Sequence, residues 1–334
     1  MQRKERKKKI QVGIIAGIMV IAAGGLVYGL WRQNRSEQAL QTGQNSGGAS
    51  RDLGITYQGK EYQYNEHLSN FLFLGIDTRE KAETKTGQAD AGQADAVFLV
   101  AWDRVEGNVS LISIPRDTLT DIEVFDQEGK SLGKSKDHIS LAYAYGDGGT
   151  ESCRLMEEAV SNLLYGVPLQ GYCSISLDGI SSLTEAIGGV DVVVPNDSLA
   201  EVEPMWSQGT EIHLDGAEAE TFVRYRNIRI EQSAMDRLQR QQEFLRSYGE
   251  RAVQVYEEDT SFLADLYSSL ENYMTTNIGK DMFAKVLSAL QREGNADSMT
   301  IPGEGVQEAE FDAYRTDDSA LYEMVLDVFY EVKE

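Results

Sequence analysis

Histidine and cysteine are scarce in this chain, and their scarcity argues against several kinds of site. The 334 residues include three His and two Cys. His67, His138 and His213 are too dispersed to form an evident metal cluster, and no His-Glu-x-x-His sequence supplies a zinc helix. The chain also lacks a complete Gly-x-x-x-x-Gly-Lys-Ser/Thr phosphate loop and a Gly-x-Ser-x-Gly elbow, although spacing alone leaves a Ser-His-Asp hydrolase open.

Basic residues are outnumbered by acids, 31 against 54, so that the net charge is −23. The first 35 residues hold eight of the basic residues and one acid, which leaves 23 basic and 53 acidic residues and a net charge of −30 beyond them. Such a surface repels nucleic acid and anionic lipid. We therefore expect no nucleic-acid partner.

Charged side chains are absent from residues 10–31. These 22 residues would form a helix of roughly 33 Å, enough to cross a bilayer core of about 30 Å. Residues 1–9 are strongly basic, so the positive-inside rule predicts a cytoplasmic tail, one transmembrane helix and an extracellular remainder at the cell membrane. A cleavable signal peptide is the rival interpretation, but its apolar core usually spans only about 7–15 residues.

Beyond the apolar segment the chain divides into a stalk and one large domain. Residues 32–54 are too polar and Gly-rich to bury a core, and we expect a flexible stalk there. Residues 55–334 show no composition break and are long enough for a single extracellular domain. Cys153 and Cys173 lie in this domain, where a disulfide is allowed; two buried thiols are the alternative, and the sequence leaves the choice open.

Apolar runs and periodicity predict alternating strands and helices in this domain. The expected strands are 55–64, 71–75, 97–102, 109–114, 172–177, 190–194 and 298–301. The expected helices are 150–164 with Thr150 as its cap, 178–187, 215–224, 233–256, 259–272, 278–291 and 317–331. This alternation predicts an α/β fold, an α/β/α layered domain with a central mixed sheet.

Two acidic residues are expected at the ends of neighbouring strands. Asp77 follows the run Phe71–Gly75, and Asp95 opens the next strand, with Asp90 as a competing candidate. Ligands bind outside the carboxyl ends of strands in open α/β sheets, and paired carboxylates invite Mg²⁺ or Mn²⁺. The alternative for Asp77 alone is a turn-capping role, with Arg79 as a solvated neighbour.

Arginines recur in three further short motifs. Arg116-Asp117 follows Pro115, which we expect to direct Arg116 away from the core, although an ordinary strand-end ion pair is the alternative. Arg224 and Arg226 would project from one face if the backbone is extended, which suggests a polyanion between them. The third motif lies on the expected helix 233–256, one face of which carries Arg237, Arg240 and Gln241.

Taken together, these segments resemble the LytR-CpsA-Psr family of membrane-anchored phosphotransferases. The resemblance covers roughly residues 55–305 and is carried most specifically by two elements, Ser-Ile-Pro-Arg116-Asp117 and Arg237-x-x-Arg240-Gln-Gln. It implies transfer of a glycopolymer, such as teichoic acid or capsule, from a polyprenyl-pyrophosphate carrier to the C6 hydroxyl of N-acetylmuramic acid in peptidoglycan. A polyprenyl chain also needs an apolar groove, for which Leu155–Leu164, Ile175–Ile187 and Leu238–Leu245 offer aliphatic residues.

The resemblance also assigns roles to residues. Asp77 and Asp95 would bind Mg (or Mn), with Asp236 as a further acid, and Asp77 or Asp117 would accept the proton of the attacking hydroxyl beside Arg116. The remaining residues would contact the lipid pyrophosphate: Arg79, Arg224, Arg226, Arg237, Arg240, Gln241 and His138. Guanidinium groups and a metal would neutralise the charge that builds on the leaving phosphate.

Three positions depart from the family pattern. Gln93 stands where many members have Arg, His138 stands where they have Lys, and Ala234 stands where an acid is common, with Asp236 as its possible substitute. The site is therefore poorer in cations than is usual. A polyprenyl-pyrophosphate phosphohydrolase and a non-catalytic lipid-binding or regulatory module are the alternative functions.

Overall fold

The computed structural model describes residues 54–333, apart from 80–81, 83, 127, 228, 231–232, 260–261, 263–265, 267–269, 271, 279–295 and 309–310. The expected cytoplasmic tail, transmembrane helix 10–31 and nearly all of the stalk lie outside the described residues, as do most of the expected helices 259–272 and 278–291. None of the described helices combines the length and the apolar character that crossing a bilayer needs.

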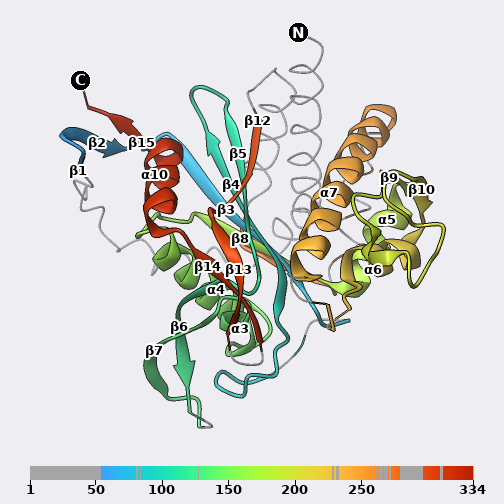
Figure 1. Ribbon diagram of the computed structural model, residues 1–334, viewed down its shortest axis with the longest axis horizontal. Coiled ribbons are helices and arrows are strands. Elements are labelled where there is room, and N and C mark those ends of the chain that lie inside the picture. The colour runs from blue at the N-terminus through green and yellow to red at the C-terminus, as the bar shows by residue number, and fades with distance from the viewer. Residues whose placement is uncertain are drawn as a thin grey trace, which may run out of the picture.

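A mixed six-stranded sheet forms the centre of the domain (Figure 1). Its strands lie in the order β11-β8-β3-β4-β5-β12. Their bounds are β3 Leu68–Ile76, β4 Ala94–Asp103, β5 Val109–Ile114, β8 Gly171–Ser176, β11 Met274–Thr276 and β12 Ala296–Thr300. Strand β3 runs parallel to β8 and β5 parallel to β12, whereas β4 is antiparallel to both of its neighbours.

The central strands are apolar on both faces, as expected for a sheet covered by helices on each side. In β3, Phe71 and Phe73 point into one hydrophobic cluster, and the intervening Leu72 points into the other. All three are buried. Each face of the sheet therefore has its own core.

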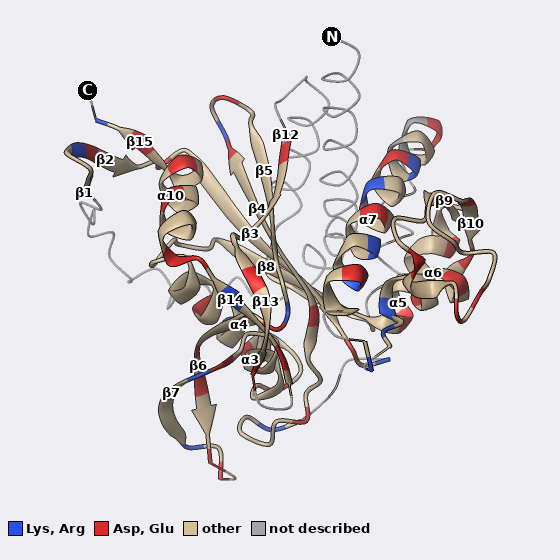
Figure 2. Cartoon of the chain, in the orientation of Figure 1, with Lys and Arg blue, Asp and Glu red and all other residues tan. Residues whose placement is uncertain are grey.

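Helices cover both faces, which confirms the predicted layered α/β domain (Figure 1). One face packs against α3 Leu141–Ala144, α4 Thr150–Leu163 and α10 Asp318–Phe329. The opposite face packs against α5 Leu177–Ala186, α6 Gly216–Arg224 and α7 Ser233–Glu258. Acidic side chains are spread over these layers, whereas basic ones recur along α7 and where the sheet meets α5 and α6 (Figure 2).

Two local predictions were wrong. The expected strand 55–64 is a hairpin of β1 Ile55–Tyr57 and β2 Lys60–Tyr64, because Gln58 and Gly59 both adopt positive φ and form a tight turn. Thr150 does not cap α4. The carboxylate of Asp147 accepts the backbone N–H groups of Gly149, Glu151 and Ser152 instead.

Several hairpins and short elements surround the main layers. The paired strands are β6 Leu119–Phe125 with β7 Ser131–His138, β9 Val190–Val193 with β10 Glu211–Leu214, and β13 Gly303–Glu308 with β14 Phe311–Thr316. Strand β15 Tyr330–Val332 adds to β2, and a 3₁₀ turn spans Asp197–Leu199. The hairpin of β6 and β7 begins just after Asp117 and ends at His138, so both of its ends lie beside the sheet edge discussed below.

The two cysteines are buried thiols, which answers the question that the sequence left open. Cys153 belongs to the core on the α4 face and Cys173 to the core on the α7 face. The sheet therefore separates them. Burial also raises the pKa of Cys153, which keeps this thiol protonated.

Candidate functional site

Charged residues from three strands meet at one edge of the sheet. Because β4 is antiparallel to β3 and β5, its amino-terminal end lies beside the carboxyl ends of those two strands. Asp77 therefore follows β3 next to Asp95 at the start of β4, as the sequence predicted. The backbone N–H of Gln93 donates to Asp77 Oδ1 at 2.6 Å and ties the two strand ends together.

Arg116 is the centre of this edge. Its Nε donates to Asp117 Oδ1 at 3.1 Å, while Nη1 pairs with Asp95 and Nη2 with the side-chain oxygen of Gln93. The side chain is only 16% exposed, and its pair with Asp117 is the strand-end ion pair that the sequence offered as an alternative. Burial, followed by the nearby cations, lowers the pKa of Arg116, and Asp117 opposes that effect.

Arg237 reaches the same edge from near the amino-terminal end of α7. Its Nη1 donates to Asp95 Oδ2 at 2.6 Å, so Asp95 bridges Arg237 and Arg116. Arg237 is 4% exposed, and its Nη2 is buried with no hydrogen-bond partner among the described residues. Burial and the nearby Arg226 lower the pKa of Arg237 to about 10, so the group stays cationic at neutral pH. This buried donor is suited to an anionic ligand.

Arg226 lies on the other side of Asp117. Its Nη2 donates to Asp312 Oδ2 at 2.7 Å and its Nε to Ser233 Oγ at 3.0 Å, while Nη1 lies 3.8 Å from Asp117 Oδ2. His138 Nδ1 lies 4.0 Å from Asp117 Oδ1. Asp312 was missed by the sequence analysis because it lies in the β14 strand, outside every recognised motif.

Arg224 and Arg226 do not share a face, so that prediction was wrong. Arg224 is the last residue of α6 rather than part of an extended segment, and Tyr225 forms the cap of that helix. As a result Arg224 lines a pocket over α5, whereas Arg226 turns to β14.

Arg240 and Gln241 mainly hold the protein together. Arg240 is fully buried, donates through Nη1 to the carbonyl of Phe222 at 2.7 Å and pairs through Nη2 with the carbonyl of Tyr225. Gln241 donates to the carbonyl of Val223 at 3.2 Å. Both side chains satisfy the free carbonyls at the end of α6. The role of Arg240 as a pyrophosphate ligand stays a prediction, and Gln241 lines the pocket.

The expected set of three metal-binding acids is not assembled. Within the described part of the chain no group of three or more His, Cys, Asp or Glu is placed to hold a metal ion. Asp236 precedes Arg237 on the helix, where successive side chains point about 100° apart, and its carbonyl accepts a bond from Asn196. Asp77 and Asp95 remain as a pair.

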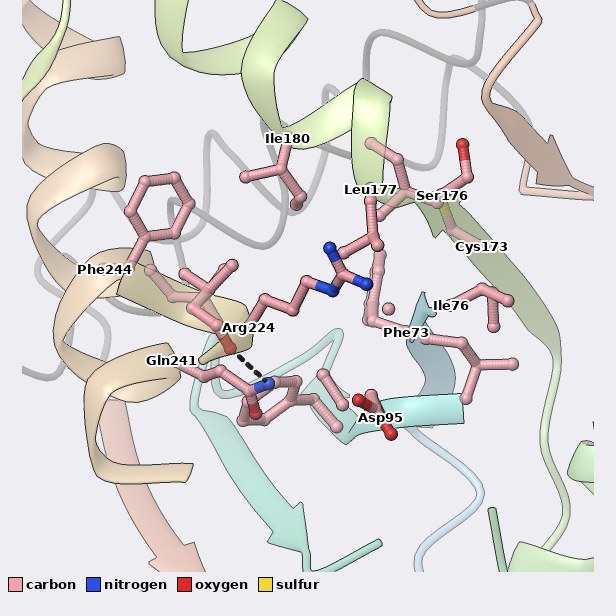
Figure 3. Close-up of a pocket in the computed structure, with 17 residues that line it drawn as sticks. Phe73, Ile76, Asp95, Cys173, Ser176, Leu177, Ile180, Arg224, Gln241 and Phe244 are labelled. Carbon is pink, nitrogen blue, oxygen red and sulfur yellow. Dashed lines mark hydrogen bonds between the residues drawn. The ribbon is translucent and has the colours of Figure 1, made fainter. Parts of the chain in front are cut away.

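An apolar pocket opens between the sheet and helices α5, α6 and α7 (Figure 3). Its walls include Phe73, Phe98, Ile175, Ile180, Phe244 and Leu245, and its polar lining residues include Asp95, Arg224 and Gln241. Figure 3 shows Arg224 extending across this space above Asp95. Two of the three predicted groove segments contribute, but Leu155–Leu164 does not, because α4 packs on the opposite face of the sheet.

Arg79 lies beside this pocket and is the most exposed arginine of the group. Its guanidinium group donates to Asp178 Oδ1 at 3.1 Å and to both carboxylate oxygens of Glu220, at 3.4 and 3.3 Å. Neither acid is recognisable as a site residue from the sequence, because each occurs singly in an amphipathic helix.

Comparison with known proteins decides the family. The sequence profile of the LytR_cpsA_psr family matches residues 32–327. This chain belongs to the LytR-CpsA-Psr family. Among its relatives, a protein of Bacillus licheniformis named polyisoprenyl-teichoic acid–peptidoglycan teichoic acid transferase TagU is 25% identical over 338 residues, which span 100% of this chain and 98% of the relative. A Bacillus anthracis protein of the same name is 26% identical over 311 residues, 91% of each chain.

Solved structures of LytR-CpsA-Psr proteins share the fold. Bacillus subtilis TagV aligns with a TM-score of 0.59 at 23% identity, covering 79% of this chain and 97% of TagV. A structure described as TagT bound to LI-WTA aligns with a TM-score of 0.59 at 21% identity, covering 79% of this chain and 90% of that one. The central mixed sheet and its covering helices are therefore those of the family.

Proposed function

We propose that this chain transfers a glycopolymer phosphate from a polyprenyl-pyrophosphate carrier to the C6 hydroxyl of N-acetylmuramic acid in peptidoglycan. The observation that carries the proposal is an apolar pocket whose mouth is bordered by Arg224 and Asp95, with Arg116 and Arg237 paired to that aspartate. An isoprenoid fits such a pocket and a pyrophosphate fits its guanidinium-lined end. The teichoic acid transferase names of the TagU relatives support the same reaction.

The reaction would take place at the outer face of the cell membrane. The uncharged segment 10–31 and the basic residues before it support a single anchoring helix with the domain outside. A carrier lipid embedded in that membrane would present its pyrophosphate to the domain.

The excess of carboxylates over guanidinium groups at the sheet edge supports the proposal that a divalent cation binds there. Three guanidinium groups face four carboxylates: Arg116, Arg226 and Arg237 against Asp77, Asp95, Asp117 and Asp312. The formal sum is −1, so these groups alone do not neutralise a pyrophosphate. Asp77 and Asp95 would hold Mg²⁺, or Mn²⁺, which prefers one or two carboxylates together with phosphate oxygens and would supply the missing positive charge.

The arginines would exchange their carboxylate partners for phosphate oxygens. Arg116 and Arg237 both hold Asp95, and Arg237 also keeps the buried Nη2 donor without a partner among the described residues. Contacts with a phosphate that gains charge as the carrier leaves stabilise the transition state more than the ground state.

Asp117 would receive the proton of the acceptor hydroxyl. The hydroxyl oxygen attacks the phosphorus that carries the glycopolymer, the bond from that phosphorus to polyprenyl phosphate breaks, and the hydroxyl proton passes to a carboxylate. Arg116 and Arg226 fix Asp117 from two sides, which leaves Asp77 for the cation. Phosphoryl transfer is loose and depends mainly on positioning, so the reaction needs little help from a base.

The test compares the full chain with its Arg116→Ala variant. Each is incubated with a polyprenyl-pyrophosphate oligosaccharide, peptidoglycan fragments and Mg²⁺, and the products are identified by mass spectrometry. We expect a sugar-phosphate adduct on peptidoglycan with the unmodified chain, at least about 100-fold less with Arg116→Ala, and unchanged yield with Arg315→Ala, an exposed arginine paired with Glu308.

Other products would identify the alternative functions. Free sugar phosphate without an adduct would show a phosphohydrolase. Lipid binding without turnover would show a binding or regulatory module, a result that the reduced cation count at Gln93 and His138 would then explain.

A further inference from the structure

One acidic side chain joins two arginines at the mouth of the pocket. Glu220 Oε1 accepts a hydrogen bond from Arg79 Nη2 at 3.3 Å and another from Arg224 Nη1 at 3.3 Å. Its Oε2 accepts a third from Arg79 Nη1 at 3.4 Å. A single carboxylate on α6 therefore links the segment after β3 to the end of α6, beside the start of α5.

The environment of Glu220 differs from that of its partners. The Glu220 side chain is 15% exposed, whereas Arg79 and Arg224 are 64% and 50% exposed. Glu220 is also the largest electrostatic influence on Arg79, whose pKa it raises, with Asp178 as the second partner. The acid is thus largely buried, whereas the two arginines are open to solvent.

The charges of this group balance. Arg79 and Arg224 contribute two positive charges, and Glu220 and Asp178 contribute two negative ones. An anion at the mouth therefore meets no excess of positive charge while the pairs are intact. Its contacts with the guanidinium groups must replace contacts that Glu220 already makes.

We propose that Glu220 lowers the affinity of the pocket mouth for a lipid pyrophosphate, because its carboxylate occupies Arg79 and Arg224 until the pyrophosphate of an isoprenoid displaces it. The proposal rests on the function proposed above. It adds that the Glu220 carboxylate competes with the lipid pyrophosphate for Arg79 and Arg224 and so lowers the affinity for the lipid. When the lipid phosphate leaves, Glu220 pairs with both arginines again.

The size of the effect follows from the exposure of the pairs. Exposed ion pairs are weak because solvent screens them, and hydrogen bonds of 3.3–3.4 Å are at the long end of the range. Releasing two such pairs should tighten binding about fivefold, which corresponds to about 1 kcal/mol.

The experiment measures binding of geranylgeranyl pyrophosphate to the full chain in detergent by isothermal titration calorimetry. Glu220→Gln removes the charge and keeps the shape of the side chain. Asp191→Asn is the matched control, because it removes one negative charge from an 87%-exposed position on β9. Thermal unfolding of each variant verifies that it is folded.

We expect Kd to fall about fivefold in Glu220→Gln and to stay unchanged in Asp191→Asn, with the gain lost when Arg224→Ala is added. Equal or weaker binding by a folded Glu220→Gln variant would overturn the proposal and leave the proposed function intact. Absence of binding by every variant, the unmodified chain included, would overturn both.

Discussion

Replacing Asp95 by asparagine removes the only carboxylate that joins Arg116 to Arg237 in the described part of the chain. The substitution keeps the shape of the side chain and one oxygen acceptor, but it leaves two buried guanidinium groups facing each other without their shared anion. Arg116 is 16% exposed and Arg237 is 5% exposed at the side chain, so water screens this repulsion poorly. We therefore expect the variant to fold with reduced stability.

The expected loss is about 3 kcal/mol in the free energy of unfolding. Removing one partner of a buried ion pair typically costs about 3–5 kcal/mol, and the remaining amide oxygen of asparagine favours the lower end. For a domain of this size, 1 kcal/mol shifts the unfolding temperature by about 2–4 °C, so the variant should unfold about 6–12 °C earlier.

Added inorganic pyrophosphate should recover much of that loss. With Asp95 removed, both guanidinium groups need another anion, and a ligand at 100 times its Kd stabilises the folded state by about 2.7 kcal/mol. The assay is thermal unfolding of the full chain followed by tryptophan fluorescence, since Trp102 and Trp206 are buried. Asp191→Asn is the control. An unfolding temperature within about 2 °C of the unmodified chain, or no larger response to pyrophosphate, would refute this account.

Two further substitutions test roles that the fold assigns. Arg240→Met should lower the free energy of unfolding by about 2 kcal/mol in urea titrations. Two buried carbonyls lose their donor, which destabilises the fold, whereas the cost of burying the charge, which lowers the pKa of Arg240, is relieved. An unchanged urea midpoint would contradict the structural role of Arg240. Burial raises the pKa of Glu157 from 4.5 to about 7, so the folded chain binds a proton that the unfolded chain releases, and stability falls as pH rises through that window. Glu157→Gln should therefore be more stable above pH 7, by about 1–2 kcal/mol after allowance for solvent screening at this half-buried site, and equal near pH 4. Unfolding temperatures of both proteins at pH 4 and pH 8 would detect the difference, and identical pH profiles would contradict it.

Long apolar segments were enough to predict the main layers. The run at Phe71–Gly75 is too apolar for any position except a covered strand, and the periodicity of 233–256 predicts a buried helix face wherever it packs. The strand β7 was missed because most of its residues are exposed, so its side chains carry no alternation of apolar and polar types. Strand β13 was missed for a similar reason, since its glycines and glutamates resemble a loop.

The site was predictable where strand ends dictate the position of a residue. Asp77 and Arg116 follow strands of the central sheet and Asp95 lies at the start of one, and neighbouring strand ends must meet. Helix spacing was less informative. It predicts that Arg237 and Arg240 share a side of α7, but only the three-dimensional position of α6 decides that Arg240 meets free carbonyls while Arg237 meets Asp95. Acids such as Glu220 have no local signal at all, because their role depends on the arginines that the fold brings to them.

Gln93 stands where many family members have an arginine, and it orients its neighbours without adding a positive charge. The side-chain oxygen of Gln93 accepts from Arg116, and its backbone N–H donates to Asp77. An arginine at this position would add a positive charge but would remove the acceptor that holds Arg116 in place. Glutamine therefore exchanges charge for orientation. Under the proposed function, we expect such a site to depend more strongly on a metal cation to neutralise a pyrophosphate than one with arginine at the same position.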